Sequence, residues 1–214
     1  MKTEEEKKMA EVVFEKVVKV YDKKVKAVNE LSFTCNNGEF FAILGPSGCG
    51  KSTLLTVLEG LEKSTDGEVL IDGEKVEGPG KNRAVVFQHY SLFPWLTARD
   101  NVIFGIKQSG KKYTRAERKE LADGYLKSVE LEEAAKKYPS QLSGGMRQRV
   151  VIAIAIACNP EILICDEPTT ALDVTIQAQI LELINRLKKA RRLSVIFITH
   201  DLGVVANIAD RIAI

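Results

Sequence analysis

The sequence predicts one α/β domain built around a largely parallel β-sheet, with helices on both faces. Three observations support this fold class. Short apolar runs alternate with longer amphipathic runs, a glycine-rich turn directly follows one apolar run, and 214 residues suit a single domain with a sizeable core. A net charge of +2, from 31 basic and 29 acidic side chains, gives no reason to expect nucleic acid as a partner.

The first half of the chain contains most of the predicted strands. Residues 11–20 are dense in β-branched side chains, and residues 38–44 form a nearly continuous apolar run that leads straight into glycines. Residues 67–76 predict a hairpin that turns at an Asp-Gly pair, and residues 83–88 predict another short buried strand.

From there to about residue 158 the pattern is helical. Within it, residues 114–131 place Leu121, Tyr125, Leu126 and Val129 roughly on one helix face. The later predicted elements are a strand at 161–165, a long helix at about 175–190, a strand at 193–199 and a short helix capped by Asp201.

Neither a secretory signal nor a membrane span is predicted. Residues 1–13 mix acids with lysines and lack an apolar centre, which excludes a signal peptide. The longest apolar run, residues 150–158, is about half as long as a membrane span requires. The cysteines, Cys35, Cys49, Cys158 and Cys165, lack metal-ligand spacing, so we expect reduced thiols in a cytosolic chain.

Residues 45–53, GPSGCGKST, predict a phosphate-binding loop between an apolar strand and an amphipathic helix. Its glycines let backbone N–H groups turn toward phosphate oxygens, and the helix N-terminus adds positive potential. We expect Lys51 to reach the β- and γ-phosphates of a nucleotide and the Ser52 hydroxyl to ligate Mg²⁺. The other candidate nucleotide-binding residues of this loop are Gly45, Pro46, Ser47, Gly48, Cys49, Gly50 and Thr53.

Two adjacent acids end a later apolar strand, in the sequence ILICDEP at residues 162–168. We expect Asp166 to hold Mg²⁺ through its water shell and Glu167 to be aimed at the attacking water. Two acids at a strand end can also be solvated turn residues. The phosphate-binding loop elsewhere in the chain favours the catalytic interpretation.

A second glycine-rich turn, LSGGMRQR at residues 142–149, begins a helix far from the first loop in sequence. The free N–H groups of Ser143, Gly144 and Gly145 would form a second anion site. Such a site would provide a further donor to the γ-phosphate, which the first loop and the two acids lack. If it contacts ATP held by another chain, hydrolysis requires two chains.

Together these motifs resemble the ATPase subunit of ABC transporters, and LSGGMRQR matches the signature motif of that family. The resemblance covers nearly all of residues 11–214. It implies a P-loop NTPase of the ABC ATPase type: a RecA-like core with a mainly parallel sheet, N-terminal antiparallel strands and an inserted helical subdomain. Residues 1–91 and 159–214 would form the nucleotide-binding core of this single domain, and residues 92–158 the helical signature subdomain.

The resemblance also implies roles for individual residues. Ser143, Gly144 and Gly145 would act in trans on the partner's ATP. Tyr21 would stack on adenine, with an exposed edge-strand aromatic as the alternative. Gln88 would contact Mg²⁺ and the attacking water, Asp173 of the ALD sequence would cross the dimer interface, and His200 would contact the γ-phosphate. His89 matches no such role. Cys49 would make the phosphate site sensitive to thiol reagents without a catalytic part.

The implied partners are a second cassette and a membrane permease. The cassettes would form a homodimer or a pseudo-symmetric heterodimer when ATP binds. The permease would insert a short helix near Gln88–Trp95, with Phe93 and Trp95 as groove candidates and subdomain core as their alternative role. The protein would then be a cytoplasmic importer ATPase, peripheral on the inner face of the membrane, with ATP and Mg²⁺ as cofactors and no nucleic-acid partner.

Two other functions stay open at this point. A non-transport ABC ATPase would carry coiled-coil insertions or two cassettes, and the sequence contains neither. A nucleotide-binding module with little turnover is the other alternative.

Two features depart from the family pattern. Up to about residue 149 the sequence resembles nitrate, sulfonate or taurine importers, whereas from about residue 150 it resembles di- and oligopeptide importers. A natural intermediate, a deep-branching homologue and an engineered chimera all fit this pattern. The chain also stops at DRIAI just as a strand begins, where the family usually continues, so we expect a truncated C-terminus with an exposed sheet edge.

Overall fold

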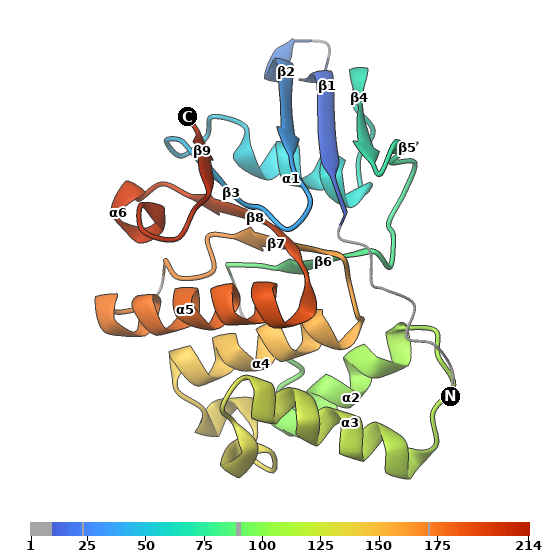
Figure 1. Cartoon of the computed structure of the whole chain (residues 1–214), viewed down its shortest axis with the longest axis vertical. Coiled ribbons are helices and arrows are strands. Elements are labelled where there is room, and N and C mark those ends of the chain that lie inside the picture. The colour runs from blue at the N-terminus through green and yellow to red at the C-terminus, as the bar shows by residue number, and fades with distance from the viewer. Residues whose placement is uncertain (1–9, 23, 89–90, 171) are drawn as a thin grey trace.

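The computed structural model describes residues 10–22, 24–88, 91–170 and 172–214. It contains two β-sheets above a group of helices (Figure 1). One sheet has four antiparallel strands in the order β2-β1-β4-β5, and the other has five parallel strands in the order β6-β7-β8-β3-β9. The predicted fold class, a mainly parallel sheet with N-terminal antiparallel strands and an inserted helical segment, is confirmed.

The antiparallel sheet consists of β1 (Val12–Tyr21), β2 (Val25–Cys35), β4 (Asp66–Ile71) and β5 (Glu74–Lys75). The predicted hairpin between β4 and β5 is confirmed by the pairing of Ile71 with Glu74. We did not predict β2, because this strand at the edge of the sheet is largely exposed and lacks the apolar run that reveals a buried strand.

The parallel sheet consists of β3 (Phe40–Leu44), β6 (Arg83–Val86), β7 (Ile162–Asp166), β8 (Ser194–Thr199) and β9 (Arg211–Ala213). Because β8 alone separates β3 from β7, the segments that follow these two strands leave the same edge of the sheet. The glycine-rich loop after β3 and the acids at the end of β7 are therefore brought together by strand order.

The main helices are α1 (Lys51–Glu59), α2 (Ala98–Gln108), α3 (Arg115–Ser128), α4 (Gly144–Ala157), α5 (Val174–Arg191) and α6 (Leu202–Val205). Two 3₁₀ turns, η1 (Glu132–Ala134) and η2 (Pro139–Gln141), lie between α3 and α4. Polar side chains cap the N-termini of α2 to α6 by accepting backbone N–H groups; they are Thr97, Thr114, Ser143, Asp173 and Asp201.

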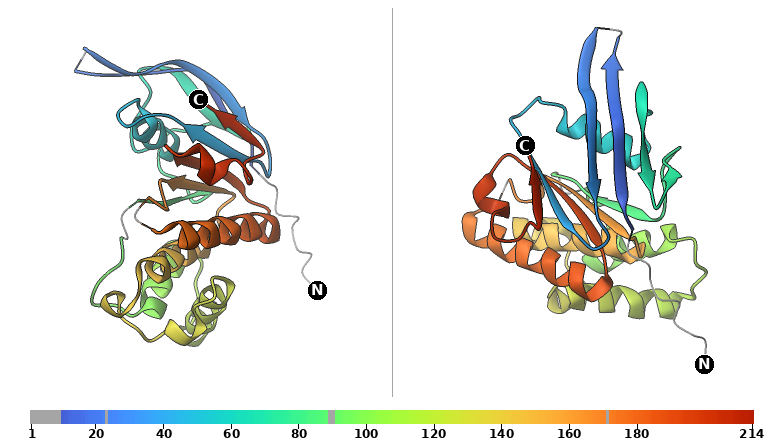
Figure 2. Two further views of the ribbon diagram at one scale, coloured as in Figure 1. Left: turned by 90° about the vertical axis from the view of Figure 1, so that its left-hand side faces the viewer. Right: turned by 45° about the horizontal axis from the view of Figure 1, so that its top comes forward.

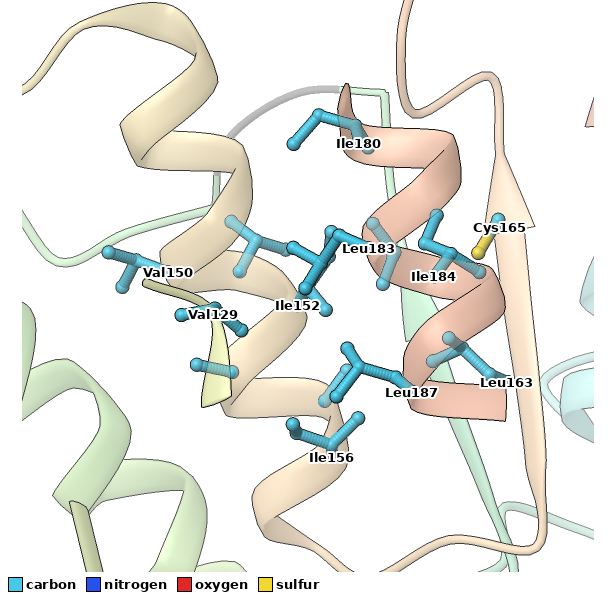
Figure 3. Close-up of a cluster of buried hydrophobic side chains, with 14 of the residues drawn as sticks. Val129, Val150, Ile152, Ile156, Leu163, Cys165, Ile180, Leu183, Ile184 and Leu187 are labelled. Atoms are coloured by element: carbon cyan, nitrogen blue, oxygen red, sulfur yellow. The ribbon is translucent and has the colours of Figure 1, made fainter. Parts of the chain in front are cut away.

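Alternate residues of the parallel strands point into two different cores. Leu163 and Cys165 of β7 belong to the core shared with α4 and α5, whereas Ile162 and Ile164 belong to the core shared with α1 and the antiparallel sheet. Figure 3 shows the first core, where Ile184 of α5 lies close to Cys165. Two further views show α5 on one side of the parallel sheet and α1 with the antiparallel sheet on the other (Figure 2).

Candidate functional site

The loop at residues 45–53 connects β3 to α1 and is shaped by two glycines with positive φ. Gly48 has a φ of +82° and Gly50 a φ of +101°, a region that residues with a side chain rarely adopt. A Cβ at Gly50 would also overlap the carbonyl oxygen of Ala27 in β2. Gly50 therefore lets the N-terminus of α1 approach the antiparallel sheet, with its free N–H groups facing the loop.

The side chain of Lys51 is folded into this loop and is only 8% exposed. Its Nζ atom donates to the carbonyl oxygens of Gly45 and Pro46, at 2.7 Å in both cases. The Sγ atom of Cys49 lies 4.0 Å from the same nitrogen. The loop backbone thus holds the ammonium group of Lys51 inside the glycine-rich loop.

The two predicted acids lie at and just after the end of β7. Burial raises the pKa of Asp166 above its usual range, and the neighbouring Glu167 raises it further, while Lys51 acts in the opposite direction. Glu167 has a φ of +44°, which is strained for a residue with a long side chain. Its N–H group donates to the Ile198 carbonyl at 3.0 Å, so β8 holds the backbone in this conformation.

Each carboxylate oxygen of Glu167 has a side-chain neighbour. His200 Nδ1 lies 3.2 Å from Oε1, and Thr170 Oγ1 lies 3.1 Å from Oε2. The Thr170 hydroxyl also lies 3.2 Å from the Glu167 carbonyl oxygen and can donate its one proton to either acceptor. Sequence reasoning missed Thr170, for which a hydroxyl three residues after the acid was the only signal.

A pocket of about 390 Å³ brings the loop and the acids together. Its walls are formed by Ala27, Ser47, Gly48, Gly50, Lys51, Ser52, Thr53, Gln88, Asp166 and Glu167. Gly45, Pro46 and Cys49 belong to the same loop but do not line the pocket. The Ser52 hydroxyl, the Gln88 carboxamide and the Asp166 carboxylate offer oxygen atoms of the kind that Mg²⁺ prefers, and one or two carboxylates suffice for that ion.

The second glycine-rich turn lies outside this pocket, since none of residues 143–145 lines it. Ser143 caps α4 by accepting the Met146 N–H at 3.3 Å, and Gly144 is the first residue of the helix. A Cβ at Gly145 would lie 2.6 Å from Cγ2 of Ile176 in α5. The signature turn is therefore packed against the first turn of α5.

Asp173 starts α5 by accepting the Ile176 N–H at 3.0 Å, and its own side chain is exposed. Because Ile176 also contacts the position of Gly145, the ALD sequence and the signature turn are joined through one side chain. Ala171 lies outside the described residues.

Tyr21 is the last residue of β1. Its hydroxyl donates to Glu62 Oε2 at 2.8 Å, and Lys19 Nζ lies 5.1 Å from the centre of its ring. Neither Lys19 nor Glu62 was singled out from the sequence, because no local pattern links residues 41 positions apart.

An aromatic cluster follows Gln88 along the chain. The Phe93 ring lies 4.7 Å from Phe104 in an edge-on arrangement and 5.5 Å from Trp95. The alternative that Trp95 is subdomain core is wrong, because this residue is 70% exposed. His89 and Tyr90 lie outside the described residues.

The cysteines are free thiols, as expected: Cys35 and Cys165 are buried, Cys158 is partly buried and Cys49 is exposed. Of the helices in the described ranges, none has the length and apolar character needed to cross a membrane.

Comparison with known proteins points to one family. A family model described as ABC transporter matches residues 28–170. The nitrate import ATP-binding protein of Synechococcus elongatus is 42% identical over 186 residues, which cover 87% of this chain and 68% of that protein. The bicarbonate transport ATP-binding protein of Synechocystis sp. is 40% identical over 211 residues, covering 97% of this chain and 75% of that protein.

An uncharacterized ABC transporter ATP-binding protein of Methanocaldococcus jannaschii is 41% identical over 207 residues, covering 94% of this chain and 75% of that protein. Among solved structures, the dimeric ATP-binding cassette MJ0796 in a post-hydrolysis state with ADP and phosphate superposes with a TM-score of 0.82 and 38% identity. The match covers 94% of this chain and 92% of that one.

Proposed function

Because the chain belongs to the ABC transporter family and is an ATP-binding subunit that hydrolyses ATP, we propose that it powers an importer through a separate membrane permease. The observation that supports ATP hydrolysis most strongly is the pocket in which the glycine-rich loop, Gln88 and two acids meet. His200 lies against one of these acids. Phosphoryl transfer needs charge neutralisation and a positioned water more than covalent chemistry from the protein.

In this proposal each pocket residue has one task. Lys51 leaves its loop carbonyls to contact the β- and γ-phosphates. Ser52, Gln88 and Asp166 would hold Mg²⁺, Asp166 through the water shell of the ion, and the ion would supply positive charge that neutralises the phosphates. The adenine ring lies against Tyr21, next to the pocket wall formed by Ala27 of the neighbouring strand.

Glu167 accepts a proton from the attacking water or orients it. His200 and Thr170 hold the two carboxylate oxygens in place, which limits the rotamers that Glu167 can adopt. His200 would also contact the γ-phosphate once the nucleotide is bound.

The signature turn acts on the partner's nucleotide. Ser143, Gly144 and Gly145 do not line the pocket of their own chain, and the similar cassette MJ0796 is dimeric. Two chains arranged head to tail would therefore complete each site. The partner is a second copy of this chain or a closely similar cassette. Asp173, exposed at the start of α5, would lie at the interface between them.

The permease would dock on the aromatic cluster of Phe93, Trp95 and Phe104, next to Gln88. This docking places the protein on the cytoplasmic face of the membrane. We assign residues 92–158, which contain α2 to α4, to the helical signature subdomain and the remaining residues to the nucleotide-binding core. One relative is named for nitrate import and another for bicarbonate transport, and the first of these names supports import over export. The resemblance of residues from about 150 to di- and oligopeptide importers, and the chimera that would explain it, stay predictions.

The experiment that tests this proposal is the solution mass of the Glu167→Gln variant by size exclusion with light scattering. Without nucleotide we expect the monomer mass of 23.7 kDa, and with Mg-ATP a shift to twice that value. Ser143→Arg in the same background is expected to bind ATP and remain a monomer. A Glu167→Gln protein that is saturated with ATP and never pairs would contradict the two-chain site.

A second arm measures steady-state ATP hydrolysis. Loss of a positioned general base typically lowers the rate about 10²- to 10⁴-fold, so the Glu167→Gln variant should fall by that factor. Lys51→Ala serves as the control for lost nucleotide binding. If Glu167→Gln hydrolyses ATP at the wild-type rate, the assignment of Glu167 as the residue that acts on the attacking water is wrong.

A further inference from the structure

We propose that Lys19 and Glu62 form a positioning pair that fixes the Tyr21 ring before the nucleotide base arrives. This inference rests on the proposed function, because it assumes that the base of ATP lies on Tyr21. Neither residue touches the nucleotide in this proposal, and both act through the tyrosine.

Three contacts define the pair. Glu62 Oε2 accepts a hydrogen bond from the Tyr21 hydroxyl at 2.8 Å. The same oxygen forms an ion pair with Lys19 Nζ, also at 2.8 Å. Lys19 Nζ in turn lies 5.1 Å from the centre of the Tyr21 ring. One carboxylate oxygen therefore holds both the tip of the ring and the ammonium that covers one of its faces, which leaves the opposite face for a base.

The register of the antiparallel sheet directs this ring toward the phosphate pocket. Tyr21 pairs with Val25 of β2, and directly paired residues in an antiparallel ladder place their side chains on the same face. Beyond a register shift, Lys19 pairs with Val28, whose Cγ2 lies 3.7 Å from the position of a Cβ at Gly50, and the neighbouring Ala27 lines the pocket beside Gly50. Tyr21 is thus adjacent to the part of the sheet that already borders the phosphate loop.

Glu62 is itself held by the end of the helix that starts in the phosphate loop. After Glu59 the chain turns at Gly60, with a φ of +77°, and the N–H groups of Leu61 and Glu62 both donate to the Thr56 carbonyl. Because α1 has nine residues, its two ends are about 14 Å apart. The helix therefore connects the phosphate loop at one end to the holder of Tyr21 at the other.

The loop after Glu62 is also bonded to β1. The Thr65 N–H donates to the Val18 carbonyl at 2.7 Å, and the Val20 N–H donates to the Thr65 hydroxyl at 3.0 Å. Lys19 Nζ adds a bond to the Lys63 carbonyl at 2.8 Å. These bonds span the irregular part of β1, where the register shifts between Val17 and Val20, so the position of the strand end depends on the loop.

The effect of the pair on folding stability should be small, because Glu62 is 37% exposed and ion pairs at exposed sites contribute little. The hydrogen bonds from Lys19 and then Tyr21 lower the pKa of Glu62, so the carboxylate is the form that the pair holds. What the pair supplies is order in the tyrosine side chain, which would otherwise lose rotamer freedom when the base binds.

The test compares binding of ADP with binding of inorganic pyrophosphate to the full chain by isothermal titration calorimetry. ADP carries the base and pyrophosphate does not, and neither is hydrolysed at this site. For Glu62→Ala we expect the ADP dissociation constant to rise about three- to tenfold, the range of one hydrogen bond, while that of pyrophosphate stays unchanged. Tyr21→Phe should give the same change, and the double variant should add nothing to either single one.

Glu68→Ala is the matched control. Glu68 pairs with Lys75 at 2.9 Å in the same sheet and is 38% exposed, yet it has no contact with Tyr21. It should bind both ligands as the wild type does. If Glu62→Ala fails to fold, Glu62→Gln and Tyr21→Phe carry the same comparison, with Glu62→Gln expected to retain part of the effect because its carboxamide still accepts from the tyrosine.

If Tyr21→Ala weakens the binding of ADP alone, the assignment of Tyr21 to the base stands. In that case two results for Glu62→Ala would overturn the inference: an unchanged dissociation constant for ADP, or equal weakening of ADP and pyrophosphate binding. If Tyr21→Ala leaves ADP binding unchanged, the assignment of Tyr21 to the base is wrong, and the positioning pair falls with it.

Discussion

The substitution Gly50→Ala tests whether the close approach of the phosphate loop to β2 shapes the site. The φ of +101° at Gly50 costs an alanine about 1–2 kcal/mol. The new methyl group would also overlap the Ala27 carbonyl oxygen and lie 3.2 Å from its carbonyl carbon, with Val28 Cγ2 at 3.7 Å. Forcing a methyl group into a packed region costs about 1–3 kcal/mol more, so we expect a loss of about 2–5 kcal/mol.

The control is Gly73→Ala in the β4–β5 turn. Gly73 has a φ of +81°, but no atom lies within 4 Å of its added Cβ, so only the backbone cost of about 1–2 kcal/mol applies. Urea unfolding of both variants measures the free energy of unfolding, and ADP titration measures the site. We expect Gly50→Ala alone to weaken ADP binding, by about tenfold or more. Equal losses of stability in the two variants, with ADP binding intact, would refute the reasoning.

Three further predictions concern pH, packing and thiol chemistry. Burial, and then repulsion from Asp166, raises the pKa of Glu59 to about 6, above its unfolded value of 4.5. The charged form is therefore disfavoured in the folded state, and Glu59→Gln should stabilise the protein by about 1 kcal/mol above pH 6, after allowance for solvent screening. Thermal melts should show this gain fading as the pH falls from 6 to 4.5, and a gain that persists at pH 4 would contradict the assignment. Ile184→Ala, in the core of Figure 3, should lower the free energy of unfolding by about 2–4 kcal/mol in urea, since the site is fully buried. Mass spectrometry after alkylation should find exposed Cys49 modified first and protected by ADP, whereas Cys165, whose pKa burial raises far above its ordinary value, should stay unmodified until the protein unfolds.

Two segments hold Glu167 in place: the end of β8 with the residue just beyond it, and the turn that follows β7. Its backbone is held by β8 through Ile198, one side-chain oxygen by His200 just beyond the same strand, and the other by Thr170 of the following turn. The strained backbone conformation of Glu167 persists because these surrounding contacts together fix it. Substitutions in either segment are therefore expected to affect hydrolysis more than nucleotide binding.

Local sequence determined much of this protein. The buried strands at β3, β7 and β8 are visible as apolar runs because both faces of a parallel sheet are covered. The helix starts at Ser143 and Asp201 are visible because capping side chains bond within three residues. The glycine-rich loop is equally local, since its glycines, lysine and serine lie within nine positions of the chain.

Tertiary structure alone decided which distant residues meet. The exposed strand β2 has no apolar pattern, yet its Ala27 carbonyl excludes any side chain at Gly50. Strand order places β8 between β3 and β7, and so brings His200 within 3.2 Å of Glu167. The bond from Tyr21 to Glu62 depends on a turn at the far end of α1. Hydrogen bonds and packing depend on distance in space, and periodicity along the chain carries no record of pairings that only the closed fold creates.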